Sequence, residues 1–119
     1  MTKRILIIDD ESGFCDVLKD LLEDEGYTVD APLQLASAIG IALLGNYDLI
    51  ILDLRMPGID GLEIARLFKQ RKLITPILII SGYITDDMPI KLDQLGIQHM
   101  LSKPSGVSQL RQAVATAIA

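Results

Sequence analysis

The sequence predicts an α/β fold in which helices cover both faces of a parallel sheet. Half of the residues are apolar but only 4% are aromatic, which favours an aliphatic α/β core over an all-β sandwich. Short apolar runs rich in Ile and Leu alternate with helical patterns, and such runs are typical of strands buried on both faces. Parallel strands need crossover connections, and right-handed crossovers place helices on both sides of the sheet.

The predicted elements form five strand–helix pairs, with no linker, repeat or low-complexity segment between them. The expected strands are residues 3–8, 28–31, 48–52, 76–80 and 97–101. The expected helices are residues 12–25, 33–44, 61–71, 88–95 and 107–118. A chain of 119 residues has the length of one ordinary domain, so we expect a single domain over residues 1–119.

Capping and breaking residues set the predicted helix boundaries. Ser12 is expected to cap the first helix, and Gly26 to end it. Pro32 and Gly45 flank the second helix, and Pro89 suits the first turn of the fourth.

The bulk composition excludes several classes of function. The net charge of −5 argues against general nucleic-acid binding. A single cysteine excludes an internal disulfide and fits a reducing compartment. The N-terminus has no signal-peptide pattern, and the apolar stretches are too short to span a bilayer. These features together predict a cytoplasmic location and no membrane association.

Five polar side chains stand where predicted strands end. Asp9 and Asp10 follow the first strand, Asp53 the third, Ser81 the fourth and Lys103 the fifth. Parallel strands end at one edge of the sheet, and ligands of such sheets bind there, at the switch in strand order that the first and third strands flank. Three carboxylates, a hydroxyl and an ammonium at this edge suit a divalent cation and a phosphoryl group.

At this point the chain resembles the receiver domain of response regulators, the CheY-like superfamily of two-component signalling. The resemblance covers the whole chain and depends on four segments in order: residues 8–11 (IDDE), 52–61 (LDLRMPGIDG), 81–82 (SG) and 103–104 (KP). It implies a flavodoxin-like, doubly wound, five-stranded parallel sheet in the order 2-1-3-4-5, with five helices.

The resemblance also implies a magnesium site. Asp10 and Asp53 would be the direct carboxylate ligands, and Asp9 would hold a metal-bound water. The backbone carbonyl of Arg55 would add a further ligand.

The same resemblance makes Asp53 the phosphoryl acceptor, since a carboxylate can attack phosphorus and form an aspartyl phosphate. Lys103 would neutralise one phosphoryl oxygen, and the Ser81 hydroxyl would donate to another. The implied donor is a histidine kinase or a phosphotransfer protein, and the phosphorylated domain would switch a partner or an effector domain. The domain would be a signalling switch, not an enzyme, that promotes only its own phosphorylation and dephosphorylation. The face formed by the fourth helix, fifth strand and fifth helix is a candidate homodimer surface.

Two features depart from or extend the family pattern. Met100 stands three positions before Lys103, where receivers usually carry Tyr or Phe. We therefore expect phosphorylation to rearrange mainly the loop at 82–87, including Tyr83. The bond between Lys103 and Pro104 is a candidate cis peptide.

Several other interpretations compete with a phosphorylation switch. Each aspartate alone could be an ordinary cap at the end of its strand. A pseudo-receiver would bind a partner without being phosphorylated, for which the replaced aromatic at Met100 is the sequence argument. A haloacid-dehalogenase type phosphatase needs a second aspartate two residues after the nucleophile, where this chain has Arg55. A dinucleotide site is disfavoured because no G-x-G-x-x-G follows the first strand.

Overall fold

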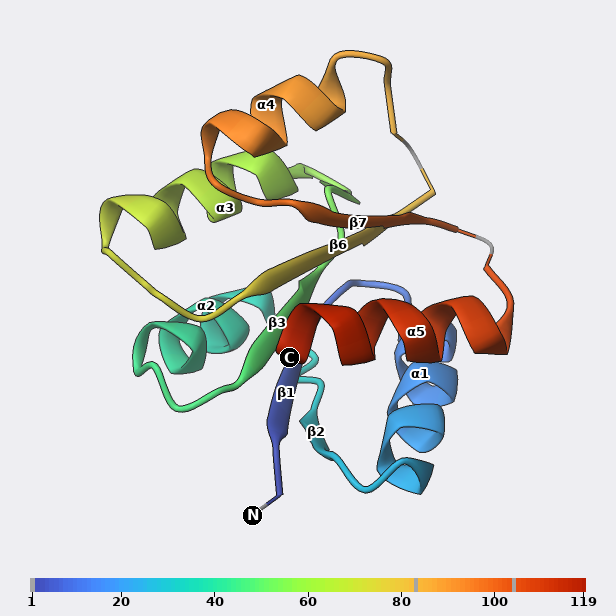
Figure 1. Cartoon of the computed structure of the whole chain (residues 1–119). Helices are drawn as coiled ribbons and strands as arrows, with labels where there is room; N and C mark the ends of the chain where they lie inside the picture. Colours follow the sequence, from blue (N-terminus) through green and yellow to red (C-terminus); the bar gives the residue numbers. More distant parts are fainter. Residues whose placement is uncertain (1, 83, 104) are drawn as a thin grey trace.

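The computed structural model describes residues 2–82, 84–103 and 105–119 (Figure 1). The strands in these residues are β1 (Arg4–Ile8), β2 (Thr28–Asp30), β3 (Leu49–Leu52), β4 (Arg55–Met56), β5 (Ile59–Asp60), β6 (Ile77–Ser81) and β7 (His99–Ser102). The helices are α1 (Ser12–Asp24), α2 (Leu35–Leu43), α3 (Gly61–Gln70), α4 (Met88–Gln94) and α5 (Val107–Ile118). The predictions for Tyr83 and for the bond to Pro104 lie outside the described residues.

The main sheet of the described chain has five parallel strands in the order β2-β1-β3-β6-β7. This is the predicted order 2-1-3-4-5, because β6 and β7 are the fourth and fifth strands of the sheet. Ile8 pairs with Leu52 across β1 and β3, so these two central strands end level with each other. The residues that follow them, Asp9 and Asp53, therefore leave the sheet side by side.

Helices cover the sheet on both faces, as predicted. Figure 1 shows α1 and α5 on one side and α2, α3 and α4 on the other. Alternate residues along the strands point to opposite faces of the sheet and pack into two separate cores. Leu6 and Ile50 belong to the core beneath α2, α3 and α4, whereas Ile5 and Ile51 belong to the core beneath α1 and α5. A sheet buried on both faces explains why its strands are wholly apolar in sequence. None of the helices in the described ranges combines the length and apolar content needed to cross a membrane.

Two local predictions were wrong in detail, and one pair of strands was not predicted. Ser12 does not cap α1: it is the first helical residue, Glu11 occupies the cap position, and no side chain caps the helix there. Helix α2 begins at Leu35, two residues later than predicted. The antiparallel hairpin of β4 and β5 was not predicted, because each strand has only two residues and the turn between them carries no long apolar run. Pro89 lies in the first turn of α4, as expected.

Candidate functional site

The five predicted side chains come from the ends of four neighbouring strands. Asp9 and Asp10 follow β1, Asp53 follows β3, Ser81 is the last residue of β6, and Lys103 follows β7. The backbone continues the sheet into the site, since the Asp53 N–H donates to the Ile8 carbonyl (3.0 Å) and the Lys103 N–H donates to the Ser81 carbonyl (2.9 Å). Asp53 and Ser81 are buried, at 3% and 0% exposure. Pairing between strands therefore fixes the backbone of Asp53, Ser81 and Lys103 at this edge.

Three carboxylates meet at this edge. One oxygen from each of Asp9, Asp10 and Asp53 lies within 4.8 Å of the others. Asp10 is exposed, Asp9 is partly buried and Asp53 is buried, so the group extends from the protein interior to the surface. Magnesium prefers such hard oxygen donors and keeps several waters, and this donor set fits it.

Lys103 brings one ammonium to these carboxylates. Its Nζ lies 2.6 Å from Asp9 Oδ2 and 3.4 Å from Asp53 Oδ2, and it also contacts Glu11 Oε1 at 3.0 Å. The Phe14 ring lies beneath the same ammonium, with its centroid 4.2 Å from Nζ. Glu11 and Phe14 were not singled out by the sequence analysis as parts of the site, although Glu11 belongs to the recognised segment at 8–11.

The electrostatics of Asp9 and Lys103 reflect this arrangement. Burial raises the pKa of the Asp9 carboxyl, and the charge of Asp53 adds to the rise, against smaller opposing effects of the hydrogen bonds from Lys103 and the Glu11 N–H. Burial would lower the pKa of Lys103, but its hydrogen bonds to Asp9 and Glu11, with the charges of Asp9 and Asp53, outweigh this and raise it to about 12. The ammonium therefore stays charged at neutral pH, whereas ionised Asp9 is destabilised by its surroundings.

The two oxygens of Asp9 are more tightly engaged than those of Asp53. Asp9 Oδ1 accepts the Glu11 N–H at 2.9 Å, and its Oδ2 accepts from Lys103. Asp53 Oδ1 accepts the Arg55 N–H only at 3.3 Å, and its other contact to Lys103 is also long. Asp53 is thus the carboxylate of this pair whose oxygens are held less closely by the protein.

Close backbone packing at Gly61 supports the strand end that carries Asp53. A Cβ at this position would lie 2.3 Å from the Asp53 carbonyl oxygen and 2.5 Å from Leu54 Cα. The Gly61 N–H donates to the Leu54 carbonyl at 2.8 Å, and Asp60 caps α3 by accepting the Leu62 N–H. This close approach explains why glycine stands at the last position of the segment 52–61.

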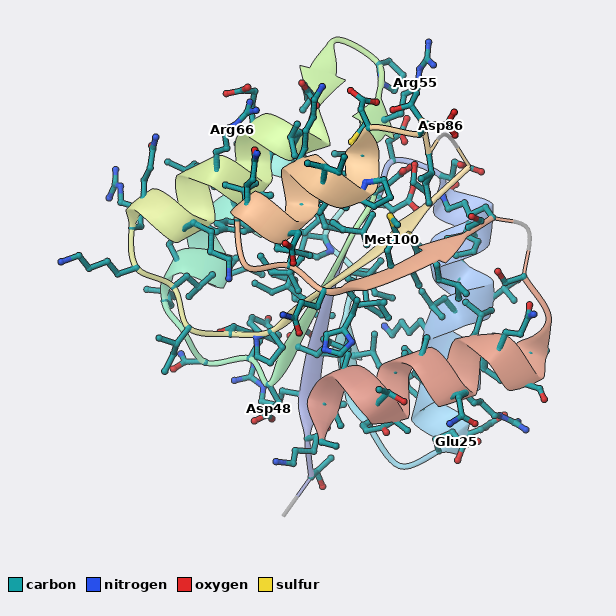
Figure 2. All side chains as sticks on the ribbon, turned by 45° about the horizontal axis from the view of Figure 1, so that its top comes forward. Glu25, Asp48, Arg55, Arg66, Asp86 and Met100 are labelled. Carbon is teal, nitrogen blue, oxygen red and sulfur yellow. The ribbon has the colours of Figure 1, made fainter. Side chains whose placement is uncertain are left out.

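The other two predicted residues are Arg55 and Met100. The Arg55 side chain is exposed, and its backbone carbonyl as a metal ligand stays a prediction. Figure 2 shows Arg55 and Asp86 at the end of the molecule where the strands terminate, and Glu25 and Asp48 at the opposite end. Met100 pairs with Ile79 in the sheet and packs, partly buried, against the core beneath α2, α3 and α4.

A doubly wound sheet with three carboxylates and a lysine at the switch point is typical of the receiver class of signalling domain. Comparison with known families agrees: the pattern of the response regulator receiver domain matches residues 5–115. The chain belongs to this family, whose members act in two-component systems.

Individual relatives include proteins of different length. The chain is 36% identical over 101 residues to the transcriptional regulatory protein ResD of Bacillus subtilis, covering 85% of this chain and 42% of that protein. It is 31% identical over 114 residues to sporulation initiation phosphotransferase F of the same species, covering 96% of this chain and 92% of that one. The chain thus spans about two fifths of the former relative and nearly all of the latter.

The solved structures include the beryllofluoride-activated receiver domain dimer of NtrC4. That domain superposes with a TM-score of 0.87 at 28% identity, over 98% of this chain and 97% of its own.

Proposed function

We propose that Asp53 is the phosphoryl acceptor of a two-component receiver domain that residues 1–119 form as one unit. The observation that supports this most is the buried Asp53 carboxylate at the end of the central strand β3, beside two further carboxylates and the Lys103 ammonium. A residue that only caps a helix or forms a turn does not require several carboxylates and an ammonium around it. Grouping these charges at a partly buried site costs free energy unless a ligand neutralises them.

The proposed reaction transfers a phosphoryl group from a histidine nitrogen of the partner to a carboxylate oxygen of Asp53. An Asp53 Oδ atom attacks the phosphorus of a phosphohistidine, the new O–P bond forms as the N–P bond breaks, and the imidazole nitrogen keeps the electron pair. Lys103 Nζ then neutralises one phosphoryl oxygen, and the Ser81 hydroxyl donates to another. Positioning and charge neutralisation supply most of the catalysis in such transfers.

Magnesium is the cofactor that fits this donor set. Asp10 and Asp53 would hold the ion directly and Asp9 through water, in keeping with the close engagement of both Asp9 oxygens by Lys103 and the Glu11 N–H. The Arg55 carbonyl is the proposed additional ligand. When bound, the ion supplies positive charge that offsets the repulsion between the carboxylates and the incoming phosphoryl oxygens.

The proposed partner is a histidine kinase or a phosphotransfer protein in the cytoplasm, where a lone cysteine stays reduced. A homodimer through α4, β7 and α5 is a further proposal; the related NtrC4 receiver domain is a dimer in its activated form, which supports dimerisation but not the choice of this face.

The test is incubation with a small acyl phosphate and Mg²⁺, followed by intact mass spectrometry. We expect one added phosphoryl group on the parent chain, none in Asp53→Asn, and none when a chelator removes the ion. Asp48→Asn is a matched control, because it removes a carboxylate at the far end of the sheet. Modification of Asp53→Asn at the parent's rate would contradict the assignment, and an unmodified parent chain would favour a pseudo-receiver.

A further inference from the structure

Two residues at the start of α1 contact Lys103 without belonging to the proposed metal ligands. Glu11 Oε1 lies 3.0 Å from Lys103 Nζ, and the centroid of the Phe14 ring lies 4.2 Å from it. The Glu11 side chain is 61% exposed, whereas that of Lys103 is only 11% exposed. The ammonium is therefore enclosed at the edge of the site, with Glu11 as its contact on the solvent side.

The partners of Lys103 fall into two groups. Asp9 and Asp53 belong to the three-carboxylate group, and an ion bound there would be attracted by the negative charge of the same two carboxylates that the ammonium now contacts. Glu11 and Phe14 do not belong to that group. An ammonium and a dication compete for Asp9 and Asp53, since each neutralises the same negative charge. An ammonium that also has a partner outside the three-carboxylate group competes less strongly with the dication for Asp9 and Asp53.

We propose that Glu11, with the Phe14 ring, forms a holding position on α1 for the Lys103 ammonium, and that this position raises the affinity of the carboxylate group for Mg²⁺. This inference rests on the proposed function. Glu11 is a positioning residue: it acts through Lys103 and keeps the ammonium beside the site while Asp9 and Asp53 are neutralised by another charge. The face of the ring stabilises a cation in the same place without adding a negative charge.

A simpler explanation would be that Glu11 attracts Mg²⁺ only as one more negative charge. Asp16 separates the two explanations, because it is an exposed acid on the same helix and lines a small cavity of about 100 Å³ that Asp9 and Asp10 also line. Asp16 takes part in none of the ion pairs found within the described part of the chain. Asp16→Asn and Glu11→Gln change the net charge equally, but only Glu11→Gln removes a contact of Lys103.

The experiment is calorimetric titration of the whole chain with MgCl₂, at about 0.15 M salt to screen distant charges. We expect Glu11→Gln to weaken Mg²⁺ binding about three- to fivefold, the size expected for a partly exposed ion pair. Asp16→Asn should change it less than about twofold. Glu11→Asp should restore part of the loss, and Phe14→Leu, which keeps an apolar side chain, should produce a smaller loss.

A second background tests whether Glu11 acts through Lys103. In Lys103→Met chains, whose folding is checked by thermal melting, adding Glu11→Gln should weaken Mg²⁺ binding less than about twofold. A direct readout without metal is the Nζ signal of Lys103 in nitrogen-15 NMR, which should shift and exchange faster with water in Glu11→Gln but not in Asp16→Asn. That signal decides the question if Lys103→Met does not fold.

The outcomes separate the two proposals. Equal effects of Glu11→Gln and Asp16→Asn on Mg²⁺ binding, or an unchanged Nζ signal in Glu11→Gln, would overturn the holding position and leave the proposed function standing. Absence of Mg²⁺ binding by the parent chain would overturn the metal site and this inference with it.

Discussion

The two ends of the central strands carry polar clusters of opposite design. Where β1 and β3 begin, Tyr47 Oη donates to Asp30 Oδ2 at 2.5 Å, and Arg4 pairs with the same carboxylate at 3.5 Å and lies over the Tyr47 ring. The Arg4 N–H donates to Asp48 at 2.8 Å. Where the strands end, one ammonium contacts three carboxylates, those of Asp9, Glu11 and Asp53, and the Asp10 carboxylate lies beside two of them.

The difference separates a structural cluster from a functional one. At the first end, each named carboxylate accepts from a cation or a hydrogen-bond donor, so the cluster is complete by itself. At the second end, four carboxylates share one ammonium, whereas the first end has two carboxylates for one guanidinium. Burial also raises the pKa of the Asp9 carboxyl, which disfavours its ionised form. A protein gains no stability from such an excess of carboxylates, so it indicates a site for a positively charged ligand such as a metal ion.

The largest expected effect is on Mg²⁺ binding, and we expect it only for a substitution at the end where β1 and β3 terminate. Asp10→Ala should weaken Mg²⁺ binding at least about tenfold, because the loss of a direct ligand should exceed the loss typical of an outer-shell partner. Asp48→Ala, at the other end, should leave Mg²⁺ affinity unchanged within about twofold. Calorimetry measures both, and an unchanged affinity in Asp10→Ala would show that the ion binds elsewhere.

The next effect is on backbone packing beside Asp53. Gly61→Ala places a methyl group against the Asp53 carbonyl and Leu54 Cα, so we expect a loss of at least about 2 kcal/mol in the free energy of unfolding. Gly45→Ala is the matched change near the other end of β3, where the new Cβ would meet open space and only the positive φ of 74° opposes it. Its cost should be about 1 kcal/mol. Equal losses in urea denaturation would contradict the proposed packing role of Gly61.

Sequence patterns predicted the functional end better than the structural end, for a physical reason. The apolar runs before Asp9 and Asp53 fix where those residues leave the sheet, because strand pairing sets the register and the register sets the edge. Contacts between long side chains have no such pattern: Glu11 and Lys103 are 92 positions apart, and their meeting depends on rotamers and on the path of the chain after β7. The Tyr47–Asp30 pair was missed for the same reason. Ser12 was misplaced as a cap because the cap position falls one residue earlier than predicted, with the Glu11 carbonyl accepting the Cys15 N–H.

A smaller effect appears at alkaline pH and belongs to the structural end. Burial, followed by the hydrogen bond to Asp30 and that residue's charge, raises the pKa of Tyr47 from about 10 to about 12. The folded chain therefore binds this proton more tightly than the unfolded chain, and its contribution to stability is complete below pH 10 and lost as pH rises to about 12. Tyr47→Phe should cost about 1–2 kcal/mol at pH 7.

This effect is measured as the difference in the free energy of unfolding between the parent chain and Tyr47→Phe. The gap between the parent chain and Tyr47→Phe, measured by urea denaturation, should narrow between pH 10 and 12, while phosphorylation at pH 7 stays unchanged in the variant. A gap that is constant across this range would mean that Tyr47 does not titrate as its surroundings indicate.

The smallest expected effect is on the melting temperature, where substitutions in the two clusters should have opposite signs. It tests the comparison between the clusters most directly. Because the folded chain holds the Asp9 carboxyl at a raised pKa, ionised Asp9 lowers the free energy of unfolding at pH 7. Asp9→Asn should therefore raise the melting temperature in the presence of a chelator. Asp30→Asn should lower it, since Asp30 accepts from Tyr47 and pairs with Arg4. With Mg²⁺ in excess, the advantage of Asp9→Asn should shrink or reverse, because the parent chain then gains binding energy that the variant lacks. If both variants lost stability equally under chelation, the contrast between a self-sufficient cluster and one that lacks its ligand would be wrong.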